Sequence, residues 1–345
     1  VIAMDHLGMG RSDKPLDVDE IRFLVHSDRL IRFIEALELT DINLFAQDWG
    51  SLIGLHVAGL NPDRFARIAI GDGDLPDIPE GSLPPVENPD EVADIPSPFD
   101  QIPEQQPSFY EGCTPLLESG GDFGAWMLYA MTAASFHPAE VLEAMTWFPL
   151  SPEVEAAYDA PFPSRVYMAG PRKMPSMITE MPGQTAEAWA GLTAFERPFL
   201  TLWAANDPGN LGQCATQQRL IDSIPGAAGQ PHDRLPEASH FLQDDQGPAI
   251  AARLATFFRS EGAAPFGAND RYCEILLGTL EGDVYEFEVF GTQGLNDCPA
   301  DAWEALDPEA IAAEFGVDEV VMNGPRYWLP EVTGSLASVE LETFG

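Results

Sequence analysis

The residues with the clearest chemical potential are AQDWGS at positions 46–51, which lie between an apolar run and a helical pattern. A sharp strand-to-helix turn needs small residues two positions before and after its centre, and Ala46 and Gly50 supply them. The central Asp48 would then present a carboxylate that attacks an sp3 carbon, displaces a leaving group and forms an alkyl ester. An ordinary helix start with Asp48 as a cap fits the same six residues.

Two further polar residues follow later predicted strands. Asp207 comes after the strand pattern at 198–204, and His240 comes after a short strand around 231–235. The chain order of nucleophile, acid and histidine is that of α/β-hydrolases, in which strand ends bring the three together. We therefore expect Asp207 to orient His240, which would deprotonate the water that hydrolyses an ester on Asp48. The alternative for Asp207 is a turn residue in the NDPG stretch at 206–209.

The elements that must position these residues alternate between strands and helices. Strand patterns occupy 1–4, 42–46, 67–70 and 198–204, and helical patterns occupy 23–37, 52–61, 213–224 and 249–258. This alternation predicts an α/β fold with a mainly parallel sheet. We assign residues 1–75 and 196–260 to that core and residues 76–195 to a helical cap over the carboxyl edge of the sheet, with helices near 123–134, 139–146, 151–158 and 186–192.

A short linker at 261–268 precedes a small α+β unit at 269–345. Residues 272–280 and 284–290 flank a turn as a hairpin, and helices at 300–306 and 308–315 and a strand at 320–322 are expected after it. The polar and aromatic stretches 296–299 and 323–328 fit either a small site or turn chemistry. The function of this unit does not follow from the sequence.

The composition excludes several kinds of partner. With 56 acidic and 17 basic residues, the net charge is -39, which disfavours binding to nucleic acid and to anionic membranes. An acidic, lysine-poor surface suits a saline cytoplasm. The four cysteines lack CxxC spacing, so we expect reduced thiols and a cytoplasmic location, and no apolar run is long enough to span a membrane. The oligomeric state is not determined by the sequence.

Several separate motifs resemble the haloalkane dehalogenases. They are QDWG at 47–50, GMGRSDKP at 8–15, SHFLQ at 239–243 and, in the cap, FGAW at 123–126, APFP at 160–163 and AGPRK at 169–173. The resemblance covers about residues 1–260. It implies hydrolysis of a small apolar haloalkane by water without cofactor or metal, with Trp49 and Trp126 binding the released halide. It also implies an apolar substrate pocket, for which the candidates are Leu52, Phe123, Met174, Pro175 and Ile178.

The chain departs from the family pattern in two places. The proline-rich stretch at 76–107 lengthens the distance along the chain from Asp48 to Trp126. The family also has three strands ahead of the strand at Val1, and a His-Gly-x-Pro loop after the third supplies half of the oxyanion hole. The backbone N–H of Trp49 would remain as the other donor. The 345 residues alone are therefore expected to be poorly soluble or inactive.

Two other functions compete with dehalogenation. An epoxide hydrolase shares the aspartate nucleophile and would use cap tyrosines as proton donors, for which Tyr129, Tyr158 and Tyr167 are available. Gln47 before the nucleophile and the second cap tryptophan argue against it. The other possibility is a non-catalytic binding protein that keeps a hydrolase scaffold. The preferred halogen and chain length of a substrate do not follow from the sequence.

Overall fold

The computed structural model of the protein describes residues 1–83, 92, 94–101 and 123–259, together with the strands 273–281, 284–291, 328–329 and 338–342. The chain divides into two compact units. The first comprises Val1–Ala228 and Arg234–Asp245, and the second comprises Gly229–Asp233 and Gln246–Gly345. The finer division into core, cap, linker and C-terminal unit stays a prediction.

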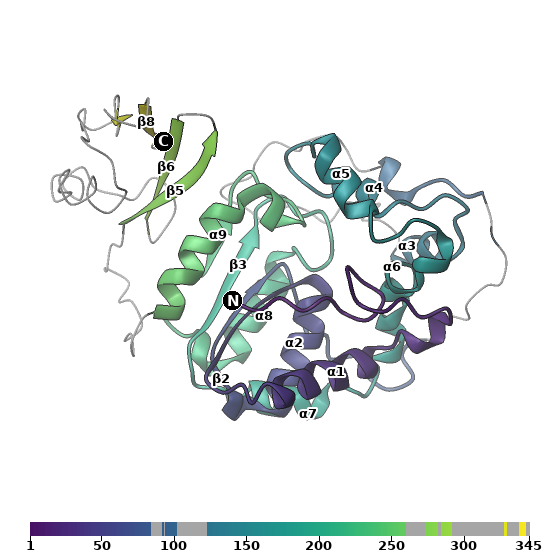
Figure 1. Cartoon of the computed structure of the whole chain (residues 1–345). Coiled ribbons are helices and arrows are strands. Elements are labelled where there is room, and N and C mark those ends of the chain that lie inside the picture. Colours follow the sequence, from purple (N-terminus) through teal and green to yellow (C-terminus); the bar gives the residue numbers. More distant parts are fainter. Residues whose placement is uncertain are drawn as a thin grey trace. The chain divides into compact units, whose positions relative to one another are not determined.

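A four-stranded sheet forms the framework around the candidate site (Figure 1). Its order is β1 (Ile42–Gln47), β2 (Phe65–Gly71), β3 (Phe199–Ala204) and β4 (Asp233–Leu235). The pairs β1–β2 and β2–β3 are parallel. Every residue of β3 is buried, as are most of those in β2, which explains why both strands are mainly apolar. The predicted α/β class with a parallel sheet is confirmed.

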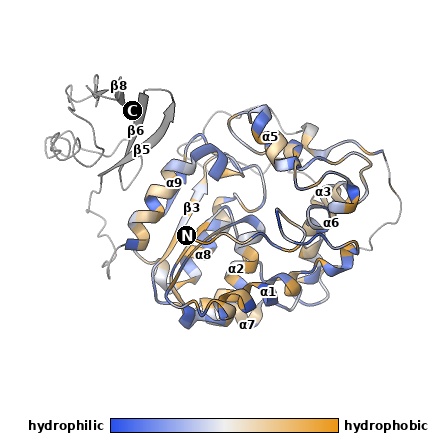
Figure 2. Ribbon diagram, viewed as in Figure 1, coloured by the Kyte–Doolittle hydropathy of each residue, from blue (hydrophilic) through white to orange (hydrophobic). Residues whose placement is uncertain are grey.

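Helix α2 (Asp48–Leu60) leads away from β1 and is buried from Ser51 to Gly59. Figure 2 shows its mainly apolar colouring, in contrast to the mixed colouring of α1 (Phe23–Ala36). Both α1 and α7 (Ala186–Leu192) pack on α2. A Cβ atom added to Gly191 would lie 1.9 Å from the carbonyl oxygen of Gly59, so α2 and α7 approach more closely than a side chain at this position allows. This contact fixes the helix that begins with Asp48.

The predicted cap region contains the expected helices with small shifts of their ends. They are α3 (Phe123–Thr132), α4 (Pro138–Ala144), α5 (Pro152–Asp159) and α7, and they are joined by α6 (Ala169–Lys173) and by the short 3-10 helices η3 (Pro98–Gln101), η4 (Arg165–Tyr167) and η5 (Met174–Glu180). The chain then continues through β3, α8 (Cys214–Ser223) and β4 to α9 (Leu242–Arg259). Shorter 3-10 turns are η1 (Val18–Glu20), η2 (Pro62–Arg64) and η6 (Pro225–Ala227).

Three expectations differ from the structure. Residues 1–4 form no strand, because a β-strand needs a neighbouring strand for its hydrogen bonds and none of the described strands pairs with them. Helix α9 begins at Leu242, seven residues before the predicted start, and has a non-helical residue at Gln246. Pro248 explains this kink, since its ring clashes with the helical backbone before it. Cys214 is disulfide-bonded, so the expectation of reduced thiols is wrong for this residue.

The second unit contains the expected hairpin. Strands β5 (Cys273–Glu281) and β6 (Val284–Gly291) are antiparallel, and the sheet continues through β8 (Ser338–Glu342) to β7 (Trp328–Leu329). The predicted helices at 300–315, the strand at 320–322 and the stretch 296–299 lie outside the described residues, as does most of the stretch 323–328. In the described part of the chain, no helix combines the length and the apolar character needed to cross a membrane.

Candidate active site

Asp48 occupies a strained turn between β1 and α2. Its φ angle is +46°, in the left-handed region that few residues other than glycine adopt. The turn is held from both sides: the N–H of Asp48 donates to the carbonyl oxygen of Asp72 at 3.1 Å, and Ser51 Oγ donates to the carbonyl oxygen of Asp48 at 2.6 Å. The strain indicates a position that serves a purpose other than capping the helix.

Gly50 is less constrained than the sequence argument assumed. A Cβ atom at this position would lie 4.0 Å from the Cβ atom of Ala46, which is an ordinary contact. A methyl group therefore fits at this position. The tighter approach is at Gly73, where a Cβ atom would lie 2.3 Å from the Oγ atom of Ser51.

His240 lies between the two predicted acidic partners. Its Nδ1 atom is 2.7 Å from Oδ2 of Asp207, and its Nε2 atom is 3.4 Å from Oδ1 of Asp48. Asp207 is buried, and its other carboxylate oxygen accepts a hydrogen bond of 2.6 Å from the N–H of Gly209. Gln47 Nε2 donates to the carbonyl oxygen of His240 at 2.9 Å, which ties the histidine loop to β1. The structure thus brings the three sequence-predicted residues together.

The electrostatic environment favours the protonated form of His240. Burial by itself lowers the pKa of this imidazole, but the charge of Asp207 and its hydrogen bond oppose that effect, with further contributions from Asp48. The net result is a pKa well above the usual value for histidine. Asp207 contributes more to this increase than Asp48, and loss of the charge on Asp48 would make the proton on His240 easier to release.

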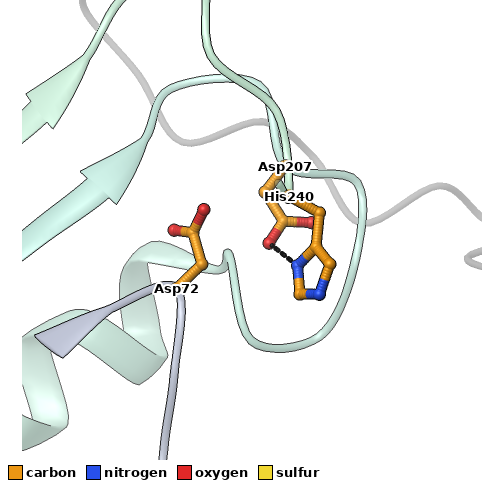
Figure 3. Close-up of side chains that lie close together, drawn as sticks. All are labelled: Asp72, Asp207 and His240. Atoms are coloured by element: carbon orange, nitrogen blue, oxygen red, sulfur yellow. Dashed lines mark hydrogen bonds and ion pairs between the residues drawn. The ribbon is translucent and has the colours of Figure 1, made fainter. Parts of the chain in front are cut away.

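Asp72 is a residue of the site that the sequence analysis did not identify. It follows β2 directly, has no exposed surface and faces the Asp207–His240 pair (Figure 3). Burial, and next the charge of Asp207, raise the pKa of its carboxyl group well above the ordinary value. The sequence feature that could have identified Asp72 is its position after the strand pattern at 67–70. The same feature led to Asp48 and Asp207.

Asp72, Asp207 and His240 form a cluster of side chains of the kinds that bind cations. Among the residues that the structure describes, oxygen and nitrogen atoms of Asp72, Asp207 and His240 lie within 4.8 Å of one another. Nδ1 of His240 and both carboxylate oxygens of Asp207 already take part in short hydrogen bonds. A cation would have to displace these bonds, so we assign the cluster to proton chemistry.

A cavity of about 250 Å³ opens beside Asp48 and His240 and has a mainly apolar lining. Of the five predicted pocket residues, three line it and two do not. Leu52 is 3% exposed within the hydrophobic core, and Ile178 packs against that core. We therefore assign both to the core. The lining residues are Asp48, Trp49, Pro98, Phe99, Phe123, Trp126, Val141, Met145, Pro171, Met174, Pro175, Pro208, Gly209, Asn210, Leu211, His240 and Phe241.

Two tryptophans contribute indole groups to this cavity. Trp189 and Trp203, outside it, donate their indole N–H groups to the carbonyl oxygens of Leu75 and Leu211 at 2.7 and 2.9 Å. Within the described part of the chain, no such acceptor is found for the indoles of Trp49 and Trp126, which both line the cavity. An unused N–H donor in an apolar cavity is suited to bind an anion.

The buried Arg172 and the partly buried Arg165 hold the helix that carries Trp126. Arg172 donates to the carbonyl oxygens of Ala130 and Ala133, each at 2.9 Å, and Arg165 donates to that of Met131 at 2.7 Å. These carbonyl groups lie at the C-terminal end of α3, where no intrahelical donors remain. Burial lowers the pKa of Arg172 to about 10, so it stays charged at neutral pH. This contact anchors α3 and its tryptophan.

A parallel sheet with an acid, a histidine and a strained aspartate at the strand ends defines the class of α/β-hydrolases. In agreement, the alpha/beta hydrolase fold family matches residues 1–211. Within that class the chain belongs to the haloalkane dehalogenases, and it is a hydrolase. A haloalkane dehalogenase of Mycolicibacterium paratuberculosis is 36% identical over 262 residues, which cover 74% of this chain and 73% of the relative.

More distant relatives agree. A haloalkane dehalogenase of Psychrobacter cryohalolentis is 32% identical, with 74% of this chain and 73% of the relative covered. Among solved structures, the tetrameric haloalkane dehalogenase DpaA of Paraglaciecola agarilytica matches with a TM-score of 0.54 and 24% identity, covering 74% of both chains. At this identity the structural match supports the fold, and the sequence matches support the family.

Proposed function

We propose that the protein hydrolyses haloalkanes to an alcohol, a halide ion and a proton through an ester formed on Asp48. The observation that carries this proposal is the position of His240, with Nε2 3.4 Å from Oδ1 of Asp48 beside the apolar cavity. The names of the relatives point to the same substrate class.

In the first step, a carboxylate oxygen of Asp48 attacks the carbon that bears the halogen. A carbon–oxygen bond forms, the carbon–halogen bond breaks, and the bonding electrons leave with the halide. Trp49 and Trp126 donate their indole N–H groups to the departing anion. These donors matter because the mainly apolar cavity offers little other stabilisation to a halide ion.

In the second step, His240 activates a water molecule. Once Asp48 is an ester it carries no charge, so its contribution to the raised pKa of His240 disappears and the neutral imidazole becomes accessible. His240 then takes a proton from water while the oxygen adds to the carbonyl carbon of the ester. The intermediate collapses, and the alkoxide leaves as the alcohol with the proton returned by the imidazolium. The proton of the added hydroxyl passes to solvent, which regenerates the carboxylate of Asp48. Asp207 stabilises the imidazolium, and the N–H of Trp49 donates to the developing oxyanion.

The epoxide hydrolase alternative is not favoured. Among the described residues, none of the three cap tyrosines lines the cavity. The hydroxyl of Tyr129 donates to the carbonyl oxygen of Ser135, Tyr158 donates to the carboxylate of Asp244, and Tyr167 is exposed. A proton donor for an epoxide oxygen would have to face Asp48 across the cavity.

The test is bromide release from 1,2-dibromoethane by the complete gene product, with styrene oxide as the competing substrate. We expect bromide release that is abolished in Asp48→Ala. The matched control is Asp63→Ala, because the side chain of Asp63 is 99% exposed and lies outside the cavity. Turnover of styrene oxide alone would support the epoxide hydrolase, and turnover of neither substrate would support a non-catalytic protein.

A further inference from the structure

Asp72 is a buried carboxyl group with no part in the proposed reaction. One of its oxygens, Oδ1, accepts a hydrogen bond of 2.9 Å from the N–H of Ala204. For the other, Oδ2, the described residues provide no hydrogen-bond partner although the atom is inaccessible to solvent. Burying an ionised carboxylate with half of its acceptors unused is strongly unfavourable, whereas burying a neutral carboxyl group is much less so. The contacts of Asp72 therefore favour its neutral form.

The charged groups around Asp72 come from three other segments. Asp207 follows β3, His240 follows β4, and Arg234 lies within β4. Asp207 is the nearby anion and already has two short hydrogen bonds, so it is the better placed of the two carboxyls to be ionised. Arg234 donates to the carbonyl oxygen of Gly212 at 2.8 Å and to Gln217 at 3.0 Å. Two carboxylates this close in a buried site do not ionise together at neutral pH.

We propose that Asp72 is a positioning residue that remains protonated beside Asp207, so that the two carboxyl groups together present a single negative charge to His240. The protonation state of Asp72 is independent of the function proposed above. Its consequence for the reaction rests on that function. A second carboxylate beside His240 would hold the proton on the imidazole and prevent it from acting as a base on the ester. A proton kept on Asp72 leaves His240 able to release its own.

The first test measures the pKa of His240 by proton NMR of its ring, with His240→Gln to assign the signal. If Asp72 is neutral, Asp72→Asn leaves this pKa in place, because amide and carboxylic acid have the same charge and nearly the same shape. In Asp207→Asn we expect the pKa to fall by about one pH unit or more. A comparable fall in Asp72→Asn would overturn the proposal, since it would show that the wild-type residue is charged.

The second test detects the proton directly. Infrared spectra of the wild type at neutral pH should contain the carbonyl band of a protonated carboxylic acid, and this band should be missing from Asp72→Asn. Asp74 and Asp245 are partly buried acids that also have raised pKa values. The difference spectrum removes their bands because the wild type and the variant both contain them. The absence of a wild-type band that depends on Asp72 would overturn the proposal.

Asp207→Asn keeps Asp72 intact and covers the case in which Asp72→Asn does not fold. Removal of the charge on Asp207 should move the titration of the Asp72 band to lower pH than in the wild type. If the Asp72 band titrated at the same pH in Asp207→Asn as in the wild type, Asp72 and Asp207 would not share a single charge. None of these measurements requires dehalogenation, so failure of the proposed function and failure of this proposal are distinguishable.

Discussion

The backbone N–H of Asp48 donates a hydrogen bond of 3.1 Å to the carbonyl oxygen of Asp72, and both residues have positive φ angles, +46° and +24°. The parallel register of β1 and β2 pairs Gln47 with Gly71, so the two aspartates follow each strand at the same level. The turn that presents the proposed nucleophile is therefore held by the turn that buries the second carboxyl group. Changes at either residue should affect both.

His240→Gln should trap the ester on Asp48. Attack on the substrate needs only the carboxylate, whereas hydrolysis of the ester needs a base at the position of Nε2. After incubation with 1,2-dibromoethane, intact-protein mass spectrometry should show one added alkyl group, and kcat should fall by roughly 10⁴-fold. The double variant with Asp48→Ala should show no mass increase. An increase that persists in the double variant would mean that another residue is alkylated.

Trp126→Phe should weaken halide binding. Phenylalanine preserves the aromatic contact with Phe99, whose ring centroid lies 4.9 Å away, but removes the N–H donor. We expect kcat to fall by roughly 10²-fold or more, with a similar result for Trp49→Phe. Fluorescence titration with bromide measures the affinity. Trp189→Phe is the control, because its indole is bonded to Leu75 outside the cavity and its loss should leave bromide affinity unchanged.

Asp72→Asn should stabilise the protein increasingly as pH rises. The folded pKa of Asp72 lies above its unfolded value of about 3.9, so folding binds a proton between these two values and stability is lost as pH rises through the window. Asparagine removes this dependence. The difference in Tm, variant minus wild type, should grow from about pH 4 to pH 8 in thermal unfolding scans. A difference independent of pH would contradict a raised pKa.

Asp245→Ala should loosen the link between the cap and the His240 loop. The carboxylate accepts hydrogen bonds from the N–H groups of Trp147 and Phe148, at 2.9 and 3.0 Å, and from Ser239 at 2.9 Å. We expect a loss of roughly 2–4 kcal/mol in the free energy of unfolding, together with a lower kcat. Denaturant titration and bromide release measure the two effects.

Tyr158→Phe is the matched control for this prediction. It removes the hydrogen bond that the Tyr158 hydroxyl donates to the carboxylate of the adjacent Asp244, a residue that is more exposed than Asp245. Its effect on stability should be below about 1.5 kcal/mol. Equal effects of Asp245→Ala and Tyr158→Phe would show that Asp245 has no special part in holding the loop.

Added KCl should raise the Tm of the protein. A net charge of -39 produces repulsion across the surface, and salt shortens the screening length from about 10 Å at 0.1 M to about 3 Å at 1 M. Thermal unfolding and bromide release at increasing KCl measure stability and activity. Optimal activity in low-salt buffer, with no gain on adding KCl, would contradict adaptation of this surface to saline conditions.

The local features of the protein could be predicted from its residues alone. Residue periodicity predicted the strands and helices, since an element's pattern depends mostly on its own residues and on which face is buried. The motif around Asp48 and the chain order of Asp207 and His240 were sufficient to propose the catalytic residues. Several separate motifs also predicted the family, and relatives in that family match about three quarters of the chain.

The contacts between distant residues depend on how the strands and helices pack together. The register of β1, β2 and β3 brings Asp72 into the pair formed by Asp207 and His240, and no local pattern encodes the distance between separate strands. This packing also assigned Leu52 and Ile178 to the core rather than the cavity, because an apolar residue satisfies either environment equally well. A backbone amide carries no sequence signature, so the three that bind Asp245 were visible only once the chain was folded.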